Sequence, residues 1–181
     1  MYPRSRMRLL LTIAVFALTL DANATQLSVP LDGHGALELD APDGWDAAVQ
    51  RPDATVPPTV QITAPEEAFV VLITPLWSPA GDASFNSPAS LRKYLDQMLE
   101  EVRPSAIETE FPFQKLDTKT ISGLYFVATD KAPKKGEFEY LAQGVGAAGN
   151  LVVSFTILAH EKPPGGIAKA LEIVRTLEHV K

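Results

Sequence analysis

A glycine-rich run is the first pattern in the sequence that could indicate a cofactor-binding site. Gly144-Val145-Gly146-Ala147-Ala148-Gly149 matches the G-x-G-x-x-G fingerprint of dinucleotide-binding loops. That fingerprint requires a strand before it and a helix after it, because the helix N-terminus faces the pyrophosphate. Here a strand-like run at residues 151–158 follows at once. The pattern therefore favours a glycine-rich hairpin turn over a cofactor site.

The histidines, serines and cysteines show no spacing typical of catalysis or metal binding. His34, His160 and His179 have no second histidine two or four residues away. No serine lies in a G-x-S-x-G or S-x-x-K context. The chain contains no cysteine, which excludes disulfides, thiol catalysis and cysteine zinc sites. We therefore predict no catalytic residue, metal or cofactor from motifs, although residues distant in sequence could still meet in the fold.

Trp77 is the first of two candidates for binding a ligand or partner. It lies between Pro75 and Pro79, where a strand-like run gives way to a loop rich in Pro, Gly, Ser and Asn. Aromatic side chains at predicted strands mostly pack in a core. Because Trp77 lies at the mouth of this loop, we predict that it lines a groove.

The second candidate is the tip of a predicted hairpin formed by residues 124–130 and 138–144. If Asp130 faces Glu137, then Glu139 lies close by and three carboxylates crowd together. Like charges directly opposite one another are unfavourable in an antiparallel pair. Two interpretations are open. Either the loop lysines Lys131, Lys134 and Lys135 offset the charge, or a bound cation or a partner's basic patch does so.

The N-terminus is typical of a secretory signal peptide over residues 1–24. Arg4, Arg6 and Arg8 precede twelve uncharged residues, and Ala22-Asn23-Ala24 fits a signal-peptidase site. Twelve helical residues rise about 18 Å, short of the roughly 30 Å hydrocarbon core of a bilayer. We therefore predict cleavage after Ala24, a periplasmic or secreted protein, and no membrane span after cleavage.

Residues 25–181 are predicted to form a single α+β domain. Strand-like runs occur at residues 26–30, 36–40, 59–64 and 68–73, and four more occur at 113–121, 124–130, 138–144 and 151–158. Apolar residues at helical spacing predict helices at 88–103 and 166–179. Too few helices separate the strands for a parallel sheet, so the pattern predicts an antiparallel sheet flanked by helices.

Two sets of motifs resemble known proteins. The order of elements, with the turn Leu39-Asp40-Ala41-Pro42-Asp43-Gly44-Trp45, resembles the PsbP-like α/β/α sandwich. More narrowly, Gly123-Leu124-Tyr125-Phe126-Val127-Ala128-Thr129-Asp130, Gly136-Glu137-Phe138-Glu139-Tyr140, Gln143-Gly144 and Phe155-Thr156-Ile157-Leu158 resemble an uncharacterised family of exported proteobacterial proteins. The superfamily resemblance implies an accessory or adaptor domain that binds other proteins, and it supplies no catalytic residues.

These observations favour an exported, non-catalytic binding or accessory module whose partner is an envelope protein or a small ligand. A small periplasmic hydrolase with an unrecognised site is the alternative, and it would need a deep pocket that holds a perturbed titratable group. Nucleic acid is not an expected partner, because 22 acidic residues against 16 basic ones give a net charge of −6.

Overall fold

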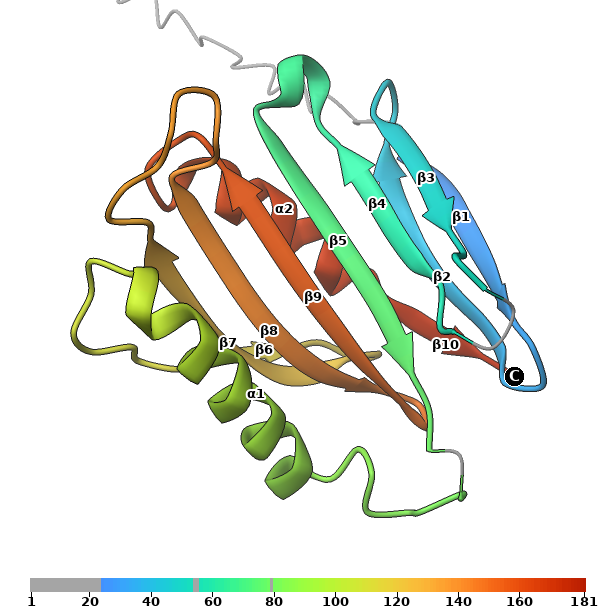
Figure 1. Ribbon diagram of the computed structural model, residues 1–181. Coiled ribbons are helices and arrows are strands. Elements are labelled where there is room, and N and C mark those ends of the chain that lie inside the picture. The colour runs from blue at the N-terminus through green and yellow to red at the C-terminus, as the bar shows by residue number, and fades with distance from the viewer. Residues whose placement is uncertain (1–23, 54–55, 79) are drawn as a thin grey trace, which may run out of the picture.

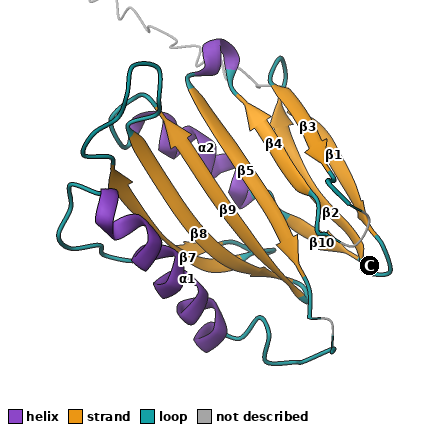
Figure 2. Ribbon diagram, viewed as in Figure 1, coloured by secondary structure: helices purple, strands orange, loops and turns teal. Residues whose placement is uncertain are grey.

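The computed structural model describes residues 24–53, 56–78 and 80–181. The predicted signal peptide therefore lies outside the described residues, except for Ala24. The described chain contains two sheets and two α-helices (Figures 1 and 2). No helix in these ranges combines the length and the hydropathy needed to cross a membrane.

A seven-stranded antiparallel sheet forms the middle of the molecule. Its strands, given in spatial order, are β3 (Asp46–Gln50), β4 (Thr59–Thr63), β5 (Phe69–Leu76), β9 (Leu151–Ala159), β8 (Tyr140–Ala148), β7 (Ser122–Thr129) and β6 (Gln114–Asp117). Short 3-10 turns occur at Pro65–Glu67 and Arg103–Ser105. The antiparallel sheet expected from the sequence is confirmed.

The first helix, α1 (Pro88–Val102), covers β7 and β8 on one face of this sheet, here called the α1 face (Figure 1). It begins as the sequence predicts, because the side chain of Ser87 accepts a hydrogen bond from the Ser90 backbone N–H and Pro88 occupies the first turn. Leu91, Leu95 and Leu99 are its buried residues. They pack with Phe126 and Val145 in a core on this face.

The second helix, α2 (Gly165–Arg175), lies across β9 and β5 on the opposite face, here called the α2 face (Figure 1). Beside it lies a three-stranded antiparallel sheet of β1 (Ala24–Leu31), β2 (Gly35–Pro42) and β10 (Glu178–Val180). The larger core is packed on this face and contains residues from both sheets and α2. Helices on both faces of an antiparallel sheet make an α/β/α sandwich.

Several predicted boundaries were wrong. The second helix ends at Arg175, and the last residues of its predicted range belong to β10. The strand predicted at 113–121 ends at Asp117, and β3 was not predicted. The glycine run is a turn only at its end, because β8 continues to Ala148.

The register predicted for the β7–β8 hairpin was also wrong, by two residues. Thr129 pairs with Tyr140, and the Asp130 N–H donates to the Glu139 carbonyl at 2.8 Å. Asp130 therefore faces Glu139 rather than Glu137. The shift is even, so every side chain keeps its predicted face of the sheet.

Candidate functional site

The two predicted binding candidates lie at opposite ends of the sheet. Trp77 follows Leu76, which pairs with Val152 at the start of β9, whereas the hairpin tip lies beside Ala159 at its end. Ala159 is seven residue steps along β9 from Val152, or roughly 23 Å. They do not form one site.

Trp77 packs against the core and against the β1–β2 turn. Its ring stacks on His34, with centroids 4.6 Å apart and an interplanar angle of 26°. The indole is therefore already covered by a neighbouring ring. None of the principal hollows found in the described residues has Trp77 in its lining.

The polar groups at the hairpin tip are mostly paired within the tip and its neighbours. Asp130 accepts a hydrogen bond from the Ala132 N–H at 2.9 Å. Glu137 accepts from the Lys134 N–H at 3.0 Å, and the Lys134 ammonium lies 3.7 Å from the same carboxylate. The Lys131 ammonium donates to the Pro104 carbonyl. Lys134 therefore offsets the charge of Glu137, whereas the ion pairs of the described residues include no lysine bound to Asp130 or Glu139.

Asp130 and Glu139 do share a small cavity of about 120 Å³ beside the C-terminal end of α1. Two carboxylates are too few for the oxygen cage that a calcium ion prefers. Within the described ranges, no three His, Asp or Glu side chains are grouped so that they could hold a metal ion.

A larger groove lies between α2 and the β6–β7 edge of the sheet, and we call it the α2 groove. It consists of two adjoining hollows, of about 470 and 310 Å³, which share Gln114, Val127 and Pro163. The inner hollow is also lined by Tyr125, Pro164, Ile167, Ala168, Leu171, Glu172 and Arg175. The outer hollow is also lined by Glu108, Glu110, Pro112, Thr129, Tyr140 and Lys162.

The inner hollow has an apolar floor. Ile167 and Leu171 are buried residues of α2, and Val127 packs against the same core from β7. The polar groups at its margin are already paired, since the Tyr125 hydroxyl donates to Gln114 at 2.8 Å and Arg175 donates to Glu172 at 2.7 Å. The floor can therefore accept an apolar group without leaving these polar atoms unpaired.

Two side chains that line the outer hollow, Glu108 and Tyr140, have pKa values shifted from their ordinary values. Partial burial by itself raises the pKa of Glu108, but hydrogen bonds from the Thr129 hydroxyl and N–H, at 2.7 and 2.8 Å, outweigh it and lower the pKa. Burial raises the pKa of Tyr140, and the adjacent Glu139 carboxylate raises it further. Glu108 therefore stays ionised and Tyr140 stays neutral near pH 7.

The lowered pKa of Glu108 has a testable effect on stability. Its contribution is present above the unfolded value of 4.5 and is lost as the pH falls through the lower folded value. We expect Glu108→Gln to lower the free energy of unfolding at pH 7 by about 0.5–1 kcal/mol, because the side chain is partly exposed. Urea unfolding should show the difference shrinking below pH 4.5.

The matched control for this prediction is Glu110→Gln. Glu110 lines the same hollow but makes none of the hydrogen bonds found in the described chain. Its replacement should leave stability unchanged at every pH. Parallel pH profiles for wild type and Glu108→Gln would contradict the assigned role of the Thr129 hydrogen bonds.

Sequence reasoning did not find the α2 groove. Its lining comes from segments around residues 108–114, 125–129, 140 and 162–175, and none of them carries a motif typical of catalysis or ligand binding. In the sequence, the Pro163-Pro164 pair indicates only a break in the chain before a helix. A signal was available in the β7 alternation, which places Tyr125, Val127 and Thr129 on one face, but it did not show that α2 leaves part of that face uncovered.

Comparison with known proteins supports the fold. No family model and no curated protein matches the sequence. The solution structure of cyanobacterial PsbP (CyanoP) from Synechocystis sp. PCC 6803 aligns with a TM-score of 0.56 and 10% identity, over 94% of this chain and 99% of that one. A crystal structure from Bacteroides thetaiotaomicron VPI-5482 aligns with a TM-score of 0.49 and 16% identity, over 80% of this chain.

This chain spans 45% of the Bacteroides protein, less than half of its length. At these identities the likeness concerns the fold alone, and function has to be argued from the site. The predicted α+β class is confirmed, and the chain has a PsbP-like α/β/α fold.

Proposed function

We propose that this protein is an exported, non-catalytic accessory module that binds a small amphipathic molecule in the α2 groove. The supporting observation is the continuity of an apolar inner hollow with a polar outer one. The apolar body of a ligand would rest on Val127, Ile167 and Leu171. Its polar end would reach Glu108, Tyr140 and Lys162, which offer an acceptor, a neutral hydroxyl and a cation.

The direction of the Glu108 shift supports binding over hydrolysis. A general acid or base that works near neutral pH needs a carboxyl pKa raised towards 7. The pKa of Glu108 is lowered, and both of its oxygens already accept hydrogen bonds from Thr129. A fixed carboxylate of this kind orients a ligand and does not exchange protons with it.

Export and membership of the exported proteobacterial family that the sequence resembles are part of the same proposal. They rest on the arginine-rich, apolar N-terminus and on the motifs of β7, β8 and β9. Mass spectrometry of the protein recovered from the cell envelope should give a mature chain that begins at Thr25. Soluble protein that still begins at Met1 would contradict export.

Binding in the α2 groove can be tested with the fluorescent apolar amine N-phenyl-1-naphthylamine, which is uncharged at neutral pH. Its fluorescence should rise and saturate with one site per chain. Ala168→Trp should reduce the affinity at least tenfold, because Ala168 is exposed on α2 and lines the inner hollow. Ala89→Trp, at an exposed position on α1, is the matched control and should bind like wild type. Equal affinity for both variants would overturn the assignment of the groove.

A further inference from the structure

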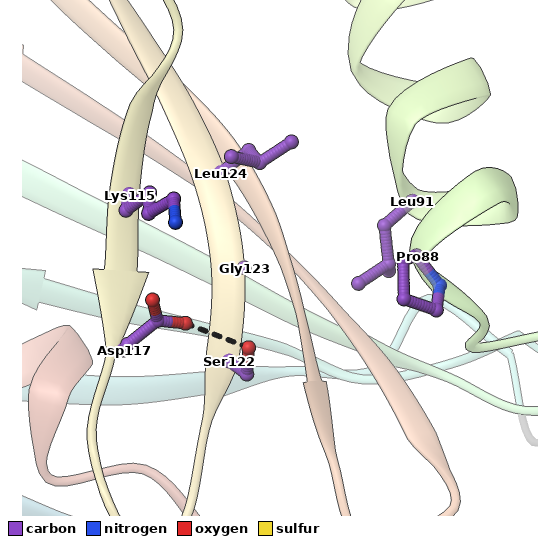
Figure 3. Close-up of a pocket in the computed structure, with 7 residues that line it drawn as sticks. All are labelled: Pro88, Leu91, Lys115, Asp117, Ser122, Gly123 and Leu124. Atoms are coloured by element: carbon purple, nitrogen blue, oxygen red, sulfur yellow. Dashed lines mark hydrogen bonds between the residues drawn. The ribbon is translucent and has the colours of Figure 1, made fainter.

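A separate pocket lies on the α1 face, on the other side of the sheet from the α2 groove. It has a volume of about 240 Å³ and lies between the start of α1 and the β6–β7 edge (Figure 3). Its lining consists of Pro88, Leu91, Lys115, Asp117, Ser122, Gly123 and Leu124. Successive strand residues alternate between faces, so Lys115 and Asp117 lie on this face whereas Gln114 lies in the α2 groove.

Apolar residues line both walls of this pocket, the wall formed by α1 and the wall formed by β6 and β7. Leu91 is 5% exposed and belongs to the α1-face core, and Leu124 is a half-buried residue that packs against the same core. Pro88 extends the α1 wall at the first turn of the helix. Figure 3 shows Pro88 and Leu91 on the helix facing β7 across the pocket.

The wall formed by β6 and β7 also carries two opposite charges that are not paired with each other. Lys115 and Asp117 reach towards the same space from β6 (Figure 3), and their Cα atoms are about 7 Å apart, two residues along a strand. The Asp117 carboxylate accepts a hydrogen bond from the Ser122 hydroxyl at 2.7 Å. The Lys115 ammonium takes part in none of the ion pairs or hydrogen bonds of the described residues.

We infer that this pocket binds a small zwitterion with an apolar side chain, which is the chemistry of a free α-amino acid such as leucine. The ligand carboxylate pairs with Lys115 and its ammonium pairs with Asp117, whose orientation Ser122 fixes. The apolar side chain packs against Leu91 and Leu124. The volume favours a ligand of this size, because pockets for drug-sized molecules begin at about 300 Å³.

The inference can be tested by titrating the ¹⁵N-labelled protein and following the amide signals of Lys115, Gly123 and Leu124 by NMR. L-leucine should bind with a dissociation constant in the millimolar range or below. Two analogues that each lack one charge, 4-methylpentanoate and 3-methylbutylamine, should bind at least about tenfold more weakly. Glycine, which lacks the apolar side chain, should also bind more weakly than leucine.

Charge-matched variants make the test specific. Lys115→Met should remove the preference for leucine over 3-methylbutylamine, and Asp117→Asn should remove the preference for leucine over 4-methylpentanoate. Lys119→Met changes a neighbouring exposed lysine that does not line the pocket, and it should bind leucine like wild type. Thermal unfolding would show that each variant folds.

Absence of leucine-dependent shifts at 50 mM would overturn the inference. So would equal binding of leucine and its single-charge analogues, or equal losses in Lys115→Met and Lys119→Met. The outcome is independent of the α2 groove, since Ala168→Trp should leave leucine binding unchanged and Lys115→Met should leave N-phenyl-1-naphthylamine binding unchanged.

Discussion

Replacing Phe126 by alanine is expected to lower the free energy of unfolding by about 3–5 kcal/mol. Phe126 has no exposed surface and belongs to the α1-face core. The ring centroids of Phe111 and Phe113 lie 6.0 and 6.2 Å from that of Phe126. Truncation of Phe126 therefore leaves a cavity and removes two contacts between aromatic rings. Urea unfolding followed by circular dichroism would measure the loss.

Two further variants define the scale of that measurement. Leu95→Ala removes a fully buried residue of α1 in the same core, and it should cost about 2–5 kcal/mol. Ile107→Ala removes a side chain that is 61% exposed, and it should cost less than about 0.5 kcal/mol. If Phe126→Ala lowered the free energy of unfolding no more than Ile107→Ala does, the assigned packing of α1 on β7 would be contradicted.

Gly123→Ala should be damaging for the opposite reason, because it adds an atom where none fits. A Cβ at Gly123 would lie 2.2 Å from the Val145 carbonyl oxygen and 2.6 Å from the Gly146 Cα. Both atoms belong to the backbone of β8, so the β7–β8 ladder itself has to separate. We expect a loss of about 3 kcal/mol, at the upper end of the usual cost of overpacking.

Gly165→Ala is the matched control for this glycine substitution. The three atoms nearest to a Cβ at Gly165, at 2.5–2.8 Å, all belong to the side chain of Glu161, an exposed residue whose side chain can move aside. Alanine is also favoured over glycine in helices. The melting temperature of the Gly165→Ala variant should therefore equal or exceed that of wild type. A Gly123→Ala protein as stable as Gly165→Ala would show that β7 and β8 are not so closely spaced.

Features set by neighbouring residues could be predicted from the sequence. The start of α1 follows from the Ser87-Pro88 pair, and its buried side follows from leucines spaced four residues apart. The side of the sheet on which each β7 and β8 side chain lies could also be predicted, because successive side chains of a strand point to opposite faces. The alternation does not fix their register, because Asp130 and Glu139 close a loop of eight residues that has no standard two-residue turn.

Features set by distant partners could not be predicted. Leu177 continues the apolar spacing of α2, so the sequence alone extends that helix too far. Leu177 is buried after the helix has ended, in the core of the α2 face, and the residues that follow it pair with β2. The α2 groove has the same origin, because it exists only where separate segments meet.

The pairing of β10 with β2 also bears on the order in which the molecule can be completed. Glu178 pairs with Glu38, so β2 can pair with β10 only after the ribosome has added 140 further residues. At about 5–20 residues per second, that wait is roughly 7–30 s of synthesis. Leu37 and Leu39 are 0% and 1% exposed in the folded protein. Before α2 and β10 are made, the part of β2 that these two elements contact stays uncovered. A nascent chain with this topology can reach its full stability only after β10 has emerged and paired with β2, and until then the hairpin of β1 and β2 is incompletely covered.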